Sequence, residues 1–385
     1  MRENIDGIIL RIQNAGLAFK NDIIFCLNRE EIYGKHNIYN ADLLKRVTCN
    51  LNRDVMLVCT PAEPYRTVIA YLTEKYGDVI YPGDYETRLL LSDLPVIPGN
   101  TEQALTSALR KRRGAVFQEG DVIVASRNLR MAYVTFSAIC FACFVKFFSD
   151  YLHCSREGLI DDRFKKSFKT ACKCLDPLPE FNNSLLKGPF TSVDDVLSAI
   201  GEAGKLTVAS RLVDASFGNI SFCKDKTLYI TRTGTYLDEL HGFIDAVDIE
   251  SPDEVPATVS SEFPVHREIV MTTGRNAVLH GHPKFAVILS MACGIRDCIH
   301  RDSCQTMCPH ERYVAGIPVV PGVSGTGPYG LCYTLPPAMK HCNTVIVYGH
   351  GLFAAGTGDF NEAYASLLSV ERKCRLEYFN LVMEK

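Results

Sequence analysis

The order of apolar and polar residues predicts an α/β protein, with helices and strands following one another along the whole chain. In the first part, residues 54–64 are typical of a strand that leaves into a loop, and 94–99 form another short apolar run. Residues 64–77 carry apolar side chains at helical spacing. A strand–turn–strand pattern at 114–126 precedes a long helix, which we expect from about 129 to 152. Such alternation is typical of α/β domains.

The most apolar segment predicts a buried helix. Residues 131–145 carry no charge, but fifteen residues are too few for a comfortable membrane crossing. The N-terminus lacks the pattern of a signal peptide. We therefore expect a cytoplasmic protein without a membrane partner, in which the 16 cysteines are reduced thiols or metal ligands.

Length and composition indicate an ordinary folded protein of about two domains. The chain has 385 residues, of which 47% are hydrophobic and 22% charged, enough to build a core. The net charge of −3 and the absence of a long basic run give no support to a nucleic-acid partner. A charged helical piece and a Pro- and Asn-rich stretch predict a linker at 154–188, between domains at 1–153 and 189–385.

An internal repeat relates the two halves. LPVIPG in the first half matches IPVVPG in the second, and the segments that follow run in the same order, so 50–152 resembles a degenerate copy of the second half. An ungapped pairing sets Glu119 opposite His350 and places Cys59 and Pro61 in the region of an HxH pair. We therefore expect the first domain to lack a metal site.

Three histidines are candidate metal ligands. His280 and His282 lie in NAVLHGHP, a predicted strand, so their side chains point the same way. His350 follows a β-branched run far downstream, at the end of another predicted strand. Zn²⁺ takes three or four such ligands, so the pattern predicts a three-histidine site.

Four motifs, in order, resemble the class II aldolase/adducin family, whose members include fuculose-phosphate aldolases. They cover about 190–385 and read GNIS, Ser260-Ser261-Glu262, His280-Gly281-His282 and His350-Gly351. The resemblance implies a class II aldolase-like α/β/α domain at the C-terminus. The internal repeat adds the expectation of a smaller α/β domain in front of it, which resembles a degenerate partial repeat of that domain. It also implies Zn²⁺ or another divalent metal on the three histidines, and a homo-oligomer.

The same resemblance implies a substrate site. Small turn residues would bind a phosphate: Gly218, Asn219, Thr233, Gly234, Ser260 and Ser261. Glu262 would act as general acid/base, and Tyr313, or else Tyr329, as a proton donor. Phe217 and Arg232 depart from the family's usual residues, so Phe217 is expected to narrow the pocket and Arg232 to add charge.

A cysteine-rich insert does not fit the family. It holds Cys293, Cys298, Cys304 and Cys308 at spacings that differ from the CxxC pairs of zinc ribbons. One interpretation is a second structural metal or an iron–sulfur cluster, and the other is a set of reduced cysteines.

These observations favour a zinc-dependent lyase acting on a small phosphorylated ketose. It would release dihydroxyacetone phosphate and an aldehyde through a zinc-stabilised enediolate. A pentulose-phosphate 4-epimerase and a methylthioribulose-phosphate dehydratase would use the same ligands, and the sequence leaves both open. An adducin-like scaffold without catalysis is a further alternative, against which the three histidines and Glu262 argue.

Overall fold

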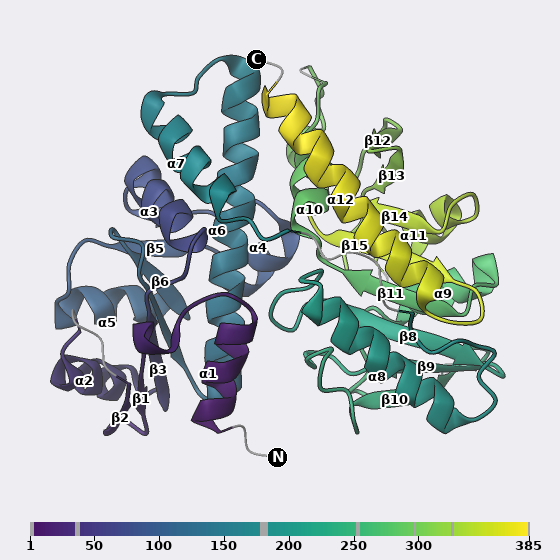
Figure 1. Ribbon diagram of the computed structural model, residues 1–385, viewed down its shortest axis with the longest axis horizontal. Helices are drawn as coiled ribbons and strands as arrows, with labels where there is room; N and C mark the ends of the chain where they lie inside the picture. Colours follow the sequence, from purple (N-terminus) through teal and green to yellow (C-terminus); the bar gives the residue numbers. More distant parts are fainter. Residues whose placement is uncertain are drawn as a thin grey trace. The chain divides into compact units, whose positions relative to one another are not determined.

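The computed structural model of the protein consists of two compact units, Met1–Pro177 and Leu178–Lys385 (Figure 1). The structure describes residues 4–34, 39–177, 184–251, 255–295, 297–324 and 327–383. The chain is α/β throughout, as its pattern predicts.

The N-terminal unit alternates helices and strands. Its elements are α1 (Ile5–Asn14), a 3₁₀ turn (Lys20–Asp22), β1 (Ile23–Leu27), β2 (Glu31–Tyr33), α2 (Ala41–Leu51), β3 (Val55–Cys59), α3 (Tyr65–Tyr76), β4 (Val79–Ile80), α4 (Tyr85–Leu91), β5 (Leu94–Ile97), α5 (Glu102–Lys111), β6 (Gly114–Phe117), β7 (Val122–Ser126), α6 (Leu129–Glu157) and α7 (Asp162–Lys173).

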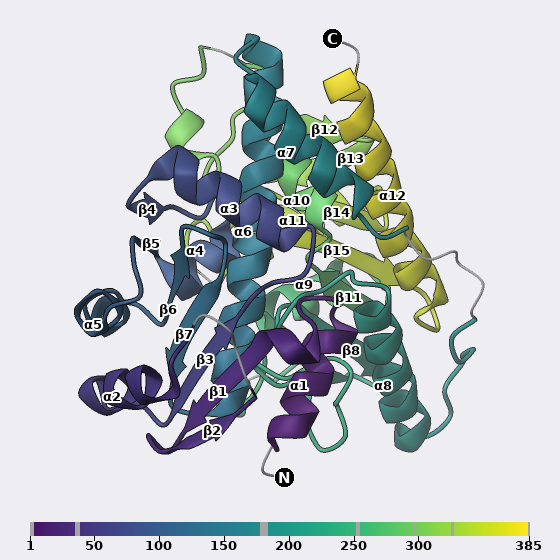
Figure 2. The same ribbon diagram turned by 60° about the vertical axis from the view of Figure 1, so that its left-hand side comes forward.

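These strands form one sheet with helices on both faces. The strand order is β2-β1-β3-β7-β6-β5-β4. Helices α2 and α5 contribute to the core on one face, whereas α6 packs on β3, β6 and β7 and also contacts α1 and α3 (Figure 2). Helix α6 is apolar on all sides, and 89% of its most apolar 18-residue window is buried, which is typical of a core helix. The prediction of a buried helix is therefore confirmed.

The C-terminal unit has its own series. Its elements are α8 (Val193–Ala209), β8 (Asn219–Lys224), β9 (Thr227–Thr231), β10 (Ile244–Asp248), α9 (Phe263–Thr273), β11 (Ala277–Gly281), α10 (Lys284–Met291), a 3₁₀ turn (Arg301–Ser303), β12 (Arg312–Val314), β13 (Ile317–Val320), α11 (Leu331–Met339), β14 (Thr344–Val347), β15 (Gly351–Gly356) and α12 (Asn361–Met383).

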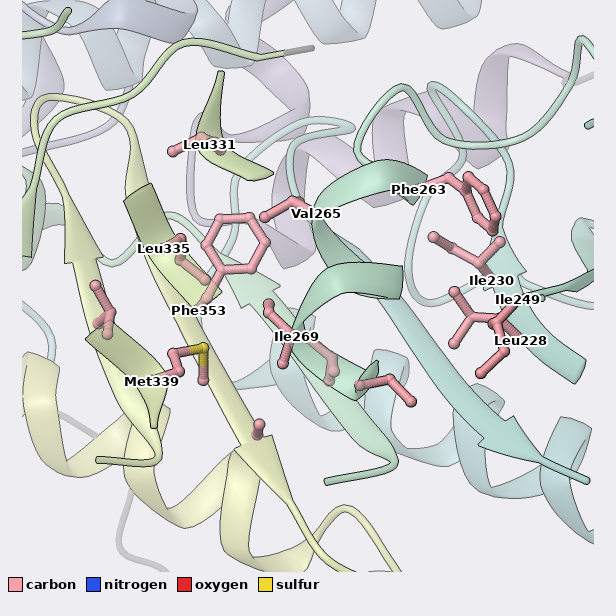
Figure 3. Packing of buried hydrophobic residues seen from close by; sticks show 14 of the residues in the cluster. Leu228, Ile230, Ile249, Phe263, Val265, Ile269, Leu331, Leu335, Met339 and Phe353 are labelled. Carbon is pink, nitrogen blue, oxygen red and sulfur yellow. The ribbon is translucent and has the colours of Figure 1, made fainter. Parts of the chain in front are cut away.

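Its sheet has the order β10-β9-β8-β11-β15-β14-β13-β12. Helices α9 and α11 pack on one face, where Ile269, Leu335 and Phe353 share a buried cluster (Figure 3). Helices α10 and α12 pack against each other on the sheet, and α12 contacts β11, β14 and β15. β11 and β15 are thus covered on both sides, which places the ends of these two strands in a dehydrated setting.

The two sheets share one connectivity. β3-β7-β6-β5-β4 in the first corresponds to β11-β15-β14-β13-β12 in the second, with the same parallel and antiparallel pairings. β1 and β2 correspond to β8 and β9. The repeat therefore extends to the N-terminal strands, beyond the 50–152 suggested by the sequence. Among the described residues of the N-terminal unit β10 has no counterpart, and only seven residues separate β2 from α2, far fewer than separate β9 from α9.

Sheet register corrects the ungapped sequence pairing by one residue. When Val96 is matched to Val319, the ladders place Val122 on Leu352, and Gly120, rather than Glu119, falls opposite His350. Through the next ladder, Val58 and Thr60 fall opposite the HxH pair. A pairing without gaps cannot follow single-residue differences in the connecting turns, whereas the hydrogen-bonded ladders of the sheet fix the register. None of the three equivalents is a metal ligand.

A hydrogen-bonded carboxylate occupies this part of the N-terminal unit. Asp121 is 2% exposed and accepts hydrogen bonds from Thr60 Oγ1 at 2.6 Å and from Tyr39 Oη at 3.2 Å. Burial, followed by the charge of Asp121, raises the pKa of Tyr39 far above its usual value, so the phenol remains a donor. In the N-terminal unit, side-chain hydrogen bonds therefore connect the strand ends whose counterparts in the C-terminal unit carry the histidines.

The segment predicted as a linker contains helix α7. Phe164 and Phe168 from this helix are buried, and Phe168 stacks on Tyr151 with ring centroids 3.6 Å apart. At least the first part of 154–188 is therefore packed in the N-terminal unit. The domain limits themselves stay a prediction.

Candidate metal centre

The structure brings the three predicted histidines together. His280 lies in β11, His282 follows the end of that strand, and His350 lies in the turn between β14 and β15. Their ring centroids are 4.6 to 5.3 Å apart, and one ligand nitrogen from each lies within 4.8 Å of the others. All three side chains are at most 2% exposed. The three side chains converge, and their role as metal ligands stays a prediction.

The protonation of these rings suits a cation. The Nδ1 of His280 lies 3.1 Å from the carbonyl oxygen of Leu352, which can only accept, so Nδ1 carries the proton and Nε2 presents a lone pair. That Nε2 lies 2.9 Å from Nε2 of His282. Burial, aided by the two neighbouring histidines, lowers the pKa of His282 well below its usual value, so the ring is neutral as a ligand must be.

Glu262 faces the same cluster. It is the residue before α9, is 6% exposed, and points Oε2 to within 3.4 Å of His280 Nε2 and Oε1 to within 3.3 Å of His350 Nε2. Among the described residues, Oε1 has no hydrogen-bond partner. A buried carboxylate oxygen without a hydrogen bond, beside three imidazoles, is a set of ligand atoms that would bind a divalent ion such as Zn²⁺. The residues therefore fit a metal.

Two elements hold the backbone around the histidines. The hydroxyl of Ser290 in α10 accepts the N–H of Gly349 at 2.9 Å and so fixes the turn that carries His350. The carboxylate of Glu371 in α12 accepts the N–H groups of Phe285 and Ala286, both at 3.0 Å, at the start of α10. Burial raises the pKa of Glu371 to about 7. The HxH segment thus lies between a paired strand and a capped helix.

Gly351 leaves the space that the histidine rings occupy. A Cβ at this position would lie 2.5 Å from the carbonyl oxygen of Gly281, 2.8 Å from Cε1 of His280 and 3.3 Å from Cδ2 of His282. Because the nearest atom belongs to a paired strand, the ring of His280 would have to move. The HG motif therefore has a steric reason for its glycine.

Gly351→Ala is expected to weaken metal binding without removing a ligand. Displacement of a ligand ring should cost about 10- to 100-fold in metal affinity, the range found when ligand orientation is disturbed. Isothermal titration with Zn²⁺ measures this. Gly201→Ala is the matched control, since a Cβ at that helical position meets nothing within 4 Å. Equal affinity of both variants and wild type would contradict the steric argument.

Of the residues predicted to bind phosphate, Thr233 and Ser260 lie on neighbouring segments, whereas Gly218 and Asn219 have other roles. The N–H and hydroxyl of Thr233 bond to the carbonyls of Thr258 and Val259, and Ser260 N–H bonds to Thr231, so the TRTG turn lies against the serine pair. Thr233, Gly234 and Ser261 are exposed. Gly218 has φ +79°, and a Cβ there would lie 2.5 Å from the carbonyl oxygen of His280. Gly218 thus allows close strand packing.

A cavity of about 570 Å³ opens at the serine pair. Its lining includes Ser260, Ser261, Arg267 and Tyr333. Arg232 does not contribute free charge here, because its guanidinium pairs with buried Asp245 at 2.7 Å. The expected extra charge of Arg232 is therefore neutralised.

Phe217 lies against the histidine cluster. Its ring stacks on His282 with centroids 5.2 Å apart, which agrees with the expected narrowing beside the ligands.

Asn219 makes different contacts from those expected. Its amide bonds to Glu262 and His266, and His266 bonds in turn to Ser221. Sequence reasoning missed Ser221 because it placed Asn219 in a turn, whereas both residues lie in β8 and, two positions apart, share one face of the sheet.

Tyr313 is not brought to the histidines within one chain. It lies on edge strand β12, four strands from β11, so about 19 Å away at the usual strand spacing, and is 63% exposed. Its role as proton donor stays a prediction. Tyr329 is 52% exposed and makes a turn beside Val323.

The four insert cysteines do not form a comparable group among the described residues, where the histidine trio is the cluster whose ligand atoms converge. Cys304 is buried, and its thiol donates to the carbonyl of Arg301 at 3.1 Å. Cys293, Cys298 and Cys308 are partly buried free thiols. These contacts favour reduced cysteines, and a second metal stays a prediction without support from ligand geometry.

Comparison with known families identifies this part of the chain. Residues 198–378 match the family model described as Class II Aldolase and Adducin N-terminal domain. The C-terminal unit is a class II aldolase/adducin domain. The match includes every residue of the histidine cluster, Glu262 and the serine pair. A search of curated proteins finds no match.

Several solved structures are similar to about half of this chain. L-fuculose-1-phosphate aldolase from Thermus thermophilus is 24% identical, with 49% of this chain and 95% of that chain covered and a TM-score of 0.41. YgbL from Klebsiella pneumoniae, a putative aldolase/epimerase/decarboxylase, is 21% identical over 49% and 91%, with a TM-score of 0.41. A sugar-phosphate aldolase from Thermotoga maritima is 18% identical over 50% and 97%, with a TM-score of 0.38.

Proposed function

We propose that the protein is a divalent-metal-dependent aldolase that cleaves a small phosphorylated ketose to dihydroxyacetone phosphate and an aldehyde. The observation that carries this proposal is the buried convergence of His280, His282 and His350 with Glu262, on a class II aldolase/adducin domain. A scaffold without catalysis has no evident use for a carboxylate oxygen that is buried and lacks a hydrogen bond.

The three histidines would hold the ion. A bound Zn²⁺ would act as a Lewis acid toward the substrate's carbonyl and hydroxyl oxygens. The lowered pKa of His282 and the burial of all three rings favour such binding, since ligand histidines must be deprotonated.

The protein's own side chains would supply the proton transfer and the phosphate binding. In the cleavage direction, Glu262 would accept the proton from the substrate hydroxyl as the carbon–carbon bond breaks, and would then give a proton to the carbon of the fragment that leaves as dihydroxyacetone phosphate. In the reverse direction it would remove a proton from that carbon. Exposed Ser261, beside the turn at Thr233, would bind the phosphate through its hydroxyl, because the N–H and the hydroxyl of Thr233 already donate to backbone carbonyls. The cavity of about 570 Å³ at the serine pair, whose lining includes neither the three histidines nor Glu262, has room for the phosphate-bearing part of a small substrate.

The test is product analysis on a panel of ketose 1-phosphates with protein reconstituted with Zn²⁺. We expect dihydroxyacetone phosphate and one aldehyde in equal amounts, and no products from protein stripped with a chelator. An epimer without fragments would favour the epimerase, and loss of water the dehydratase. Either result, or no turnover on the whole panel, would overturn the aldolase assignment.

A further inference from the structure

We propose that Ser221, His266 and Asn219 form a buried chain of oriented hydrogen bonds that holds one oxygen of Glu262 and leaves the other to take the proton. His266 is thereby a positioning residue, not a ligand or a reacting group. This inference rests on the proposed function for the role of Glu262, whereas the chain itself is a property of the folded unit.

The contacts are continuous and dry. Asn219 Nδ2 donates to Glu262 Oε2 at 2.6 Å, His266 Nε2 lies 2.5 Å from Asn219 Oδ1, and Ser221 Oγ lies 2.7 Å from His266 Nδ1. Ser221 and His266 are fully buried, Asn219 is 7% exposed and Glu262 is 6% exposed. A buried network of this kind has little freedom, because water cannot replace a lost partner.

Local structure brings the four residues together. Asn219 and Ser221 are two apart in β8 and so share one face of the sheet. Glu262 precedes α9, and His266 lies one helical turn further on, on the same side. This chain of hydrogen bonds therefore connects the first residues of β8 to the first turn of α9, directly after the serine pair.

Chemistry fixes every proton along the chain. An ionised carboxylate only accepts, so Asn219 must donate to it and its Oδ1 must then face His266. That oxygen also only accepts, so Nε2 of His266 carries the hydrogen and Nδ1 is an acceptor, which leaves Ser221 to donate. Burial lowers the pKa of His266 to about 3, in agreement with a neutral ring. One tautomer alone satisfies all four groups.

The consequence concerns the two oxygens of Glu262. Oε2 is occupied by the amide of Asn219, whereas Oε1, 3.3 Å from His350 Nε2, has no hydrogen-bond partner among the described residues. A proton on Oε2 would point at the amide N–H of Asn219, which is also a donor, and this hydrogen bond of the network would be lost. Oε1, on the side of the three histidines, is therefore the atom that accepts the proton.

The activity arm of the test uses Ser221→Ala, His266→Leu and His266→Gln in zinc-loaded protein. We expect kcat to fall about tenfold in the first and about 100-fold in the second, as is usual when a supporting hydrogen bond is lost. His266→Gln, whose amide can still donate to Asn219, should recover most of the rate. KM and the Zn²⁺ dissociation constant should stay within threefold of wild type. Thr207→Val is the matched control, because it removes another fully buried hydroxyl, bonded to Ala203 within α8.

Two results in this arm would overturn the proposal. One is a kcat for Ser221→Ala equal to that of Thr207→Val, since a folded variant would then lose the donor without effect. The other is loss of Zn²⁺ binding in step with activity, which would make the chain a support of the ligands. If His266→Leu does not fold, the comparison of Ser221→Ala with Thr207→Val still decides.

A second arm needs no activity. Nitrogen-15 spectra of histidine-labelled wild-type protein should show His266 as a neutral ring with hydrogen on Nε2, and Ser221→Ala should mix the tautomers. Hydrogen on Nδ1 in wild type would refute the chain. Failure of every sugar phosphate as substrate would instead refute the proposed function, and the tautomer result would then judge the chain separately.

Discussion

His282→Ala is expected to abolish both metal binding and turnover. The ring of His282 lies 2.9 Å from the ligand nitrogen of His280 and is 1% exposed, so its loss leaves two histidines around a buried void. Lewis-acid stabilisation supplies several kcal/mol, so activity should fall by about 10³-fold or more. Metal analysis of protein purified without chelator should give one ion per wild-type chain and less than 0.1 per variant chain, on the order of a tenfold loss of occupancy.

The matched control is His341→Ala, which removes an exposed histidine of the same unit. It should keep its metal and its rate. Two ions per wild-type chain, one of them retained in His282→Ala, would revive the insert cysteines as a second site. Full occupancy in His282→Ala would refute the three-histidine centre.

The strand periodicity of NAVLHGHP was enough to predict that His280 and His282 share a face, since side chains alternate along any strand. The later His350 needed more, because sequence alone does not state which strand lies beside β11. In the structure β15 pairs with β11 and the turn before it delivers His350. Motif order supplied that contact through the family resemblance, and spacing along the chain did not.

Other features depend on the third dimension entirely. The family resemblance placed Asn219 at the phosphate, but in the structure its amide is held inward by Glu262 and His266, both at the start of α9. The one-residue shift around Gly120 has the same origin, since sheet ladders fix register and sequence matching does not. Sequence patterns therefore predicted the elements and the convergence of the three histidines better than the contacts that orient them.

Glu262→Gln is expected to separate metal binding from chemistry. The variant keeps an oxygen that can accept the hydrogen bond from Asn219, so the fold around α9 should persist. It loses the ability to accept a proton on Oε1, and general acid–base catalysis contributes about 10²- to 10⁴-fold. We expect kcat to fall by about 10³-fold while one metal ion per chain remains, because the three histidines are intact.

The control for this change is Glu250→Gln, which neutralises an exposed carboxylate paired with Lys226 at 2.9 Å. Its kcat and metal content should match wild type. If Glu262→Gln lost its ion, the carboxylate would be a required fourth ligand, and proton transfer would need another group. If it kept both ion and rate, the unsatisfied Oε1 would have no catalytic role. A metal-loaded but slow Glu262→Gln, beside a metal-free His282→Ala, is the pair of results that only the proposed division of labour produces.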